Sequence, residues 1–404
     1  MERDANRCTA THHATVSRNL NIWLLFTISK STAIVVPILP IYFMEQGGYS
    51  VQYMLGVASL YILVPVLLDI PFGALADRIG QRQILLLGSG LFLASFLAVL
   101  SNTPLSYHLY MLTTGLAAAC YSGSETLCLR GLLTSDLSLS RTLAQINEKF
   151  YVITAILLVL AGALYTVAPP LPLVIQCGML LLAIAALLAL PNNRSELHQH
   201  AKTPCQRHTP GASNALWLLL TATLVVGYSG LFAGLVQLNS RTVQIQFTEA
   251  SGWNGYILVG VIFAVGNLAS AAGARLASAF WLDVSDETKL HISAYLAAIA
   301  AWFLSNDSTG FLTIGFLTLC VFKGFFRPPL AACMSRLAQR GRRHATAYAV
   351  LNVASAAIAA AIHFVAAESF TEFQPLYLGM TLGLAIYSSV SWVLFTFSRD
   401  RGVH

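Results

Sequence analysis

The sequence predicts an all-α integral membrane protein with twelve transmembrane helices in two six-helix bundles. The 404 residues are 56% hydrophobic and only 10% charged, and the mean hydropathy is +0.67. A soluble globular fold could not bury so much apolar surface. Apolar runs long enough to cross about 30 Å of hydrocarbon as a helix recur along the whole chain.

The first bundle is expected within residues 20–190, after a cytoplasmic tail at residues 1–19. Because that tail is polar, we expect no cleavable signal peptide before the first span. The six spans of this bundle are predicted at residues 20–44, 51–76, 83–101, 105–133, 146–168 and 171–190.

A polar segment, PNNRSELHQHAKTPCQRHTPGAS at residues 191–213, is expected to be a cytoplasmic linker. Its three histidines and one cysteine match no zinc spacing, so we expect a solvated linker, no metal site and no cofactor. The second bundle is expected within residues 214–397, before a cytoplasmic tail at residues 398–404. Its spans are predicted at residues 214–238, 253–280, 289–304, 309–333, 344–367 and 374–397.

The positions of lysine and arginine predict the orientation in the membrane. An even number of spans puts both termini on one side, and most basic residues outside the spans fall on that side, whereas Arg241 falls on the other. Basic residues are retained on the cytoplasmic side, so we expect both termini in the cytoplasm. The net charge of +6 then follows from topology. We expect contacts with membrane lipids and no nucleic-acid partner.

The loop after the second span carries a diagnostic motif. Its residues fit the pattern G-x-L-x-D-R-x-G-x-R at Gly73, Leu75, Asp77, Arg78, Gly80 and Arg82. This pattern, with twelve spans and a central cytoplasmic linker, resembles the major facilitator superfamily over the whole chain. The resemblance implies that superfamily's fold and a secondary transporter. It also implies a cytoplasmic gate that contains Gly73, Asp77, Arg78, Gly80 and Arg82.

Other stretches resemble one bacterial, efflux-like branch of the superfamily, which implies that the chain lies in a bacterial inner membrane. They are ILPIYFMEQG, LLDIPFG, YSGSETL, FRPPL and HATAYAVLN. Two departures stand out. Arg130 occupies a position where members of this branch often have an acid, and VITAILLVLAGALYTVAPP lacks the G-x-x-x-G-P-x-x-G-G run of drug antiporters. The second departure argues against drug antiport.

Asp69 is an acid inside the second span. It lies eight residues before Asp77, which places it about 12 Å deeper along the helix at about 1.5 Å per residue. An ionisable residue at this depth costs at least about 2.5 kcal/mol, so it is a functional candidate. Apolar surroundings favour the protonated carboxyl, as a proton-carrying site requires. The alternative is a structural partner for a basic group or hydroxyl on a neighbouring helix.

Lys30 and Glu125 are further ionisable candidates within the spans of the first bundle. Glu125 is expected to bind substrate or a proton. Lys30, near the middle of the first span, needs an anion or must lose its proton, and a structural pair with Asp69 or Glu125 is the alternative. Arg130 lies about 140° around the helix from Glu125 and cannot pair with it. For Arg130 we expect an ion pair with Glu148 or Asp136.

Lys323 and Arg327 give the second bundle an excess of positive charge. Their i, i+4 spacing puts them on one face of the tenth span. They require Glu125 or Asp69 from the other bundle, or an anionic group on the substrate. For Arg327, attraction to helix-end carbonyls and lipid phosphates is the alternative. Gln237 and Asn352 could contact substrate or form hydrogen bonds between helices.

Small residues are concentrated on two spans. The eighth carries Gly266, Ser270 and Gly273 at spacings that let helices approach closely, and the eleventh is dense in alanine from Ala345 to Ala361. These helices fit either ordinary tight packing or a sliding interface between the bundles.

We predict alternating access, with a small organic substrate bound between the bundles near mid-membrane. Asp77 is expected to accept hydrogen bonds from N–H groups at residues 345–347, where the eleventh helix starts, and so hold the cytoplasmic side closed. Proton-driven export is favoured, and the cationic residues indicate an anionic or chelating substrate such as a siderophore. We expect a monomer.

Three other interpretations remain. The same charges would serve proton-coupled uptake of a metabolite, and multidrug efflux is a further alternative. A non-transporting receptor is a remote one, because no sizeable extramembrane domain is predicted. The sequence contains no paired catalytic constellation or nucleotide-binding loop, so we do not expect an enzyme.

Overall fold

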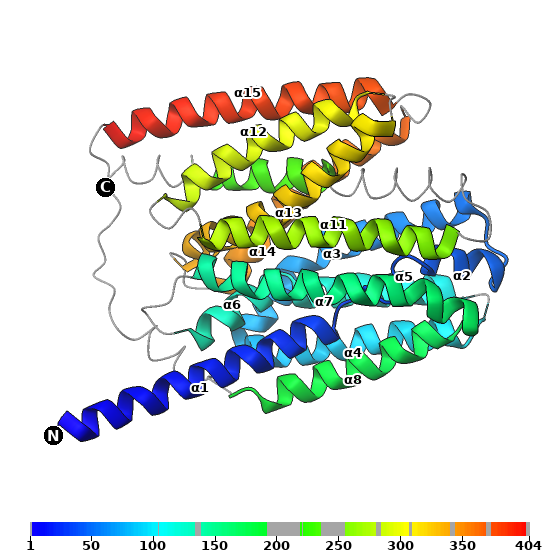
Figure 1. The fold of residues 1–404 in the computed structure, drawn as a ribbon, viewed down its shortest axis with the longest axis horizontal. Coiled ribbons are helices and arrows are strands. Elements are labelled where there is room, and N and C mark those ends of the chain that lie inside the picture. Colours follow the sequence, from blue (N-terminus) through cyan, green and yellow to red (C-terminus); the bar gives the residue numbers. More distant parts are fainter. Residues whose placement is uncertain are drawn as a thin grey trace.

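The computed structural model describes residues 2–103, 105–133, 139–191, 219, 221–235, 255–279, 284–306, 309–339, 344–368 and 373–400. All regular secondary structure in these residues is helical, which confirms the predicted fold class. We call the helices before residue 190 the first half and those after residue 220 the second half. The helix α1 begins and α15 ends at the same end of the molecule, which we call the termini end (Figure 1).

In the first half, the residues that the structure describes form eight helices, which correspond to six spans. They are α1 (Glu2–Ser29), α2 (Leu39–Glu45), α3 (Val51–Ile79), α4 (Gln81–Leu100), α5 (Ser106–Tyr121), α6 (Ser124–Leu132), α7 (Leu139–Val167) and α8 (Leu171–Ala189). The first predicted span is divided between α1 and α2, and the fourth between α5 and α6. The helix α1 extends back to Glu2, so the segment expected as a polar tail is helical from residue 2.

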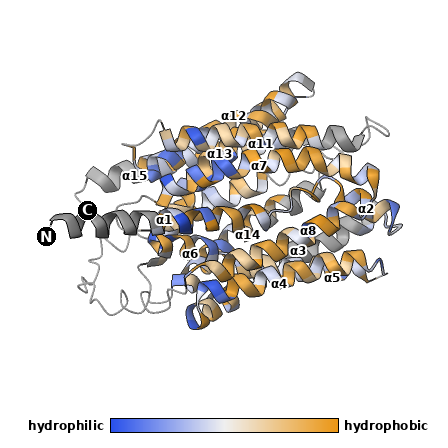
Figure 2. Cartoon of the chain, turned by 60° about the horizontal axis from the view of Figure 1, so that its bottom comes forward, coloured by the Kyte–Doolittle hydropathy of each residue, from blue (hydrophilic) through white to orange (hydrophobic). Residues whose placement is uncertain are grey.

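In the second half, the described residues form six helices, each matching one predicted span. They are the helix Thr221–Leu235, α11 (Gly255–Ala279), α12 (Asp286–Leu304), α13 (Thr309–Gln339), α14 (His344–Glu368) and α15 (Phe373–Asp400). Hydrophilic residues gather mostly near the termini end, and apolar residues cover the remaining length (Figure 2).

Five described helical segments are long and apolar enough to cross a membrane on length and composition alone. They are Gln81–Leu100, Leu139–Val167, Leu171–Ala189, Gly260–Ala279 and Gly310–Ala338. Three shorter apolar helices add Thr221–Leu235, His344–Ala359 and Tyr377–Val393.

The two divided spans have local causes. Pro37 lies between α1 and α2, and Pro40 is the second residue of α2. Proline lacks an N–H and disfavours helix in the residue before it, which favours a break in this span. Between α5 and α6, Gly123 has a φ of +69°. Only glycine adopts this conformation at little cost, so Gly123 fixes the second break.

Two helix pairs make the most extensive contacts between the halves. In one pair, α7 packs along α11, and Asn267 Nδ2 donates to Thr154 Oγ1 over 3.0 Å. In the other pair, α3 packs along α14, and a Cβ added to Gly73 would lie 2.9 Å from the carbonyl oxygen of Ala345. A hydrophobic core that includes Ala76 of the first half and Tyr348 of the second crosses this boundary.

Within the second half, glycines bring α11 and α13 into backbone contact. A Cβ on Gly273 would lie 1.8 Å from the carbonyl oxygen of Val321, and one on Gly324 would lie 1.8 Å from that of Ser270. Gly266, Ser270 and Gly273 therefore pack against a helix of their own half, which favours ordinary tight packing at these three positions. Elsewhere α11 packs along α7 of the first half, so a sliding interface between the bundles stays a prediction.

Replacing Gly324 with alanine is expected to destabilise the protein by about 1–3 kcal/mol, because the new methyl group meets a backbone carbonyl that cannot move alone. Thermal stability is measured by heating the purified protein and finding the temperature at which half of it no longer elutes in the monodisperse peak from a size-exclusion column. Gly383→Ala is the matched control, since a Cβ there meets nothing within 4 Å. Equal behaviour of the two variants would contradict the close approach of α11 and α13.

Candidate substrate and coupling site

An ion pair joins the two breaks in the first half. Lys30 directly follows α1, and Glu125 lies in the first turn of α6. Lys30 Nζ forms a salt bridge and hydrogen bond with Glu125 Oε1. It also lies 4.8 Å from the ring centroid of Tyr121 and 5.6 Å from that of Phe26. The side chains are only 18% and 28% exposed. Of the partners considered for Lys30, the structure therefore supplies Glu125 and not Asp69.

The partner of Asp69 is a hydroxyl. Ser122, at the C-terminal end of α5, donates from Oγ to Asp69 Oδ2 over 2.8 Å. Asn352 of α14 donates from Nδ2 to the same Ser122 Oγ over 2.6 Å. Asp69 is 5% exposed. Two candidate residues from different halves are thus connected through the break between α5 and α6.

One stripe of α14 contacts the first half. Ala345, Tyr348, Ala349 and Asn352 have the i, i+3, i+4, i+7 spacing of a single helix face. Ala345 and Ala349 pack against Gly73, and the ring of Tyr348 packs against Gly123. The Tyr348 hydroxyl lies 3.4 Å from Thr126 Oγ1. This stripe, which we call the α14 contact face, touches both the gate motif and the break in the fourth span.

The cations of α13 have no described counter-ion. Lys323 Nζ lies 5.6 Å from the ring centroid of Tyr151. In the described parts of the chain no carboxylate oxygen lies within 4.0 Å of Lys323 or Arg327. Arg327 is exposed and interacts electrostatically with Tyr348. The acids considered for these cations, Glu125 and Asp69, are engaged elsewhere.

The gate motif contacts both α14 and its own half. Asp77 Oδ1 accepts from Ala345 N over 3.0 Å, and Oδ2 accepts from Thr346 N over 3.0 Å and from Thr346 Oγ1 over 2.8 Å. Gly80, with a φ of +103°, makes the turn between α3 and α4. These contacts lie where the sequence predicts them, and whether they gate transport stays a prediction.

Arg82 acts within the first half. It donates from Nε to Leu187 O over 2.8 Å and from Nη2 to Leu188 O over 2.7 Å. These carbonyls end α8, where the helix dipole attracts cations. Arg78 is exposed. Of the motif, Asp77 and Gly73 contact the other half directly.

Arg130 differs from expectation. It donates from Nη1 to Ser335 Oγ over 3.1 Å and so reaches across to α13. The expected pair with Glu148 is wrong, because Glu148 Oε1 instead lies 3.9 Å from Arg275 Nε of α11. The other partner considered, Asp136, lies outside the described residues, as does the candidate Gln237.

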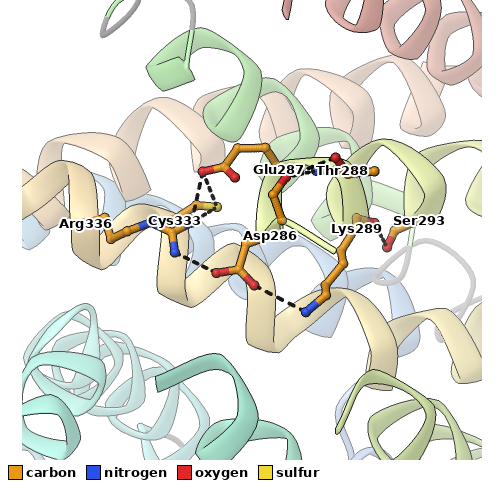
Figure 3. Close-up of polar contacts among 8 residues, drawn as sticks. Asp286, Glu287, Thr288, Lys289, Ser293, Cys333 and Arg336 are labelled. Atoms are coloured by element: carbon orange, nitrogen blue, oxygen red, sulfur yellow. Dashed lines mark hydrogen bonds and ion pairs between the residues drawn. The ribbon is translucent and has the colours of Figure 1, made fainter. Parts of the chain in front are cut away.

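The sequence reasoning missed a charged cluster between α12 and α13 (Figure 3). Arg336 donates to Asp286 Oδ2 over 2.7 Å and to Glu287 Oε1 over 3.0 Å. Lys289 Nζ lies 3.7 Å from Asp286 Oδ1. Both acids occupy the first turn of α12, after the N-cap Ser285, which is the available sequence signal. The cluster ties two helices of the second half near the termini end.

Comparisons with known proteins address the family. The model of the Major Facilitator Superfamily matches residues 22–362. The human organic anion transporter MFSD10 (TETRAN) has a crystal structure with a TM-score of 0.68 and 17% identity, covering 94% of this chain and 99% of that chain. FucP, a Major Facilitator Superfamily transporter crystallised in the outward conformation, has a TM-score of 0.63 and 12% identity, covering 92% of this chain and 97% of that chain.

A comparison with curated proteins found no match. The identities to the two solved structures are low, so those structures support the fold alone. The family model matches well over half of the chain and agrees with the fold. The protein therefore belongs to the Major Facilitator Superfamily and is a multi-pass membrane transporter.

Proposed function

We propose that this transporter exports a small organic anion in exchange for protons, by alternating access between its two halves. The observation that carries the substrate class is the pair of cations on α13, Lys323 and Arg327, without a described carboxylate partner. A chelating metabolite such as a siderophore is one kind of substrate in this class. We do not expect enzymatic activity.

The balance of charges supports an anion. Lys30 is neutralised by Glu125, and Asp69 contacts a serine hydroxyl. Two positive charges on α13 then remain for the substrate to balance, in a region where an unpaired charge is costly. A guanidinium binds carboxylates through two parallel hydrogen bonds, so Arg327 suits an anionic oxygen group.

Two arguments support the mechanism and the orientation. The α14 contact face and the pairing of α7 with α11 join halves that could separate as units, as alternating access requires. The excess of basic residues on the side of the termini supports a cytoplasmic location for both, in a bacterial inner membrane. We propose a monomer as the working unit.

Export rests on the resemblance of ILPIYFMEQG and YSGSETL to an efflux-like bacterial branch and on acids within the spans. Proton-coupled uptake would use the same charges. Proteoliposomes that contain a pH-sensitive dye distinguish the two directions of coupling. Adding a transported anion outside raises the lumenal pH if protons leave as the anion enters, and lowers it if both enter together.

Binding to purified protein tests the substrate class. The probes are citrate and 2,3-dihydroxybenzoate as anions, glucose as a neutral compound and ethidium as a cation. Ligand binding raises thermal stability by mass action, so an anion should shift the melting temperature and glucose should not. Stabilisation by ethidium or glucose, and by neither anion, would contradict the proposed substrate class and favour multidrug efflux or sugar uptake.

Arg327→Gln is expected to weaken binding of the stabilising anion by about tenfold to a hundredfold, because hydrogen bonds to charged groups contribute about 1.5–3 kcal/mol. Arg327→Lys keeps the charge but loses the planar fork, so an intermediate loss is expected. Arg275→Gln is the matched control, because this arginine is 76% exposed and lies 3.9 Å from Glu148. An equal loss in both glutamine variants would show a general charge effect.

A further inference from the structure

Asp69 has one carboxyl oxygen with a partner and one without. Oδ2 accepts the hydrogen bond from Ser122. Oδ1 is buried and has no hydrogen-bond partner in the described structure. No lysine, arginine or histidine nitrogen of the described residues lies within 4.0 Å of this carboxyl. An ionised carboxylate in such a place would be a buried charge without compensation.

The direction of the hydrogen bonds around Ser122 follows from its single proton. A serine hydroxyl donates once and accepts through its lone pairs. Because Asn352 Nδ2 donates to Ser122 Oγ, the serine proton is free to point at Asp69 Oδ2. The chain of donors therefore runs from α14 through the break in the fourth span to Asp69 on α3.

The titratable groups that the structure describes around Asp69 supply no positive charge. From α5, Cys120 interacts electrostatically with the carboxyl. From α14, Tyr348 contacts Thr126, and from α4, Arg82 binds the carbonyls that end α8. On α3 itself, Asp77 is two helical turns away and contacts α14. The Lys30 charge is taken by Glu125.

The two protonation states of Asp69 therefore differ in cost. Burying an unpaired carboxylate costs several kcal/mol, whereas a neutral carboxyl with one unmade hydrogen bond costs about 1–3 kcal/mol. The arrangement seen, with α14 joined to α3 at the termini end, thus fits a neutral Asp69.

We propose that Asp69 is the residue that carries the coupling proton, and that Ser122 and Asn352 link its protonation to the docking of α14 on the first half. This rests on the proposed proton coupling and names the group that performs it. With the proton on Oδ1, the halves stay joined at the termini end. Release of the proton leaves a carboxylate that requires water, which weakens this packing and favours separation of the halves there.

Infrared difference spectroscopy tests the protonation directly. The full-length protein in lipid nanodiscs is titrated from acid to alkaline pH, and the loss of a carboxylic-acid C=O band is followed. The band is expected in the wild type and in Glu125→Gln and should be missing in Asp69→Asn. A band that persists in Asp69→Asn, or that disappears in Glu125→Gln, would overturn the assignment.

Spin-label distances test the link to α14. Labels on noncanonical residues at Leu188 of α8 and Ala279 of α11 report the separation of the halves at the termini end and leave the native cysteines intact. Both positions are exposed. If one proton is released on separation, the ratio of short to long distances should fall about tenfold per pH unit in the wild type. It should not change with pH in Asp69→Asn.

Ser122→Ala removes the hydrogen bond between Asp69 and the connection to α14. In this variant the C=O band of Asp69 should remain but shift in frequency, and the spin-label distances should no longer change with pH. An unshifted band overturns the proposal even if Asp69→Asn does not fold. A change in distance on replacing sodium with potassium at constant pH also overturns it, because the cation would then be sodium. None of these experiments includes a substrate. A negative result would therefore overturn the role of Asp69 but not the proposed anion transport, which the binding experiment tests separately.

Discussion

Replacing Asp77 with asparagine is expected to slow transport at least about tenfold while the protein still folds and inserts. The Asp77 carboxylate accepts hydrogen bonds from the first N–H groups of α14 and from Thr346 Oγ1. Asparagine has one acceptor oxygen and would turn an NH₂ group towards another donor. Hydrogen bonds to a charged group contribute about 1.5–3 kcal/mol, and the negative charge also favours the N-terminus of α14. The termini end would then close less often.

The measurement is uptake into proteoliposomes of the anion that stabilises the wild type, normalised to the amount of inserted protein. Thr346→Val removes one of the three hydrogen bonds and should have a smaller effect, within about threefold. Arg78→Gln is the charge control, because Arg78 belongs to the same motif but is exposed. Normal transport by Asp77→Asn would show that the contact with α14 is not a gate.

The spans could be predicted closely because the thickness of the membrane fixes the length of apolar helix. The predicted span at residues 83–101 corresponds to α4 at Gln81–Leu100, and that at residues 171–190 to α8 at Leu171–Ala189. The contact of Asp77 with the start of α14 was also predictable. The carboxylate of the motif accepts hydrogen bonds from the unpaired N–H groups in the first turn of a helix, and this interaction depends little on the rest of the packing.

The breaks in the first and fourth spans could not be predicted from hydropathy, because turns within an apolar run leave its hydropathy unchanged. Their signals were local: two prolines after Lys30, and Gly123 between serines. Arg130 shows a different limit. Its partner Ser335 lies beyond the predicted end of the tenth span at residue 333, since α13 continues to Gln339. Which polar groups meet across the halves depends on such helix lengths and on packing.

The Lys30–Glu125 ion pair connects the two breaks, so removing either charge is expected to destabilise the protein. Glu125→Gln leaves the Lys30 ammonium near two aromatic rings with no described carboxylate, and Lys30→Met leaves the Glu125 carboxylate without its cation. Removing one member of a buried pair costs about 3–5 kcal/mol. Because these side chains are 18% and 28% exposed, we expect about 2–3 kcal/mol for each single variant. Thermal unfolding of purified protein measures this.

The double variant Lys30→Met/Glu125→Gln separates stability from function. With both charges removed, no unpaired charge remains, so stability should return to within about 1 kcal/mol of the wild type. Transport should not recover if the pair binds substrate or moves with it, since a neutral pair cannot exchange partners with an anion. Recovery of both stability and transport would mean that the ion pair only braces the two breaks. The anion would then depend on Lys323 and Arg327 alone.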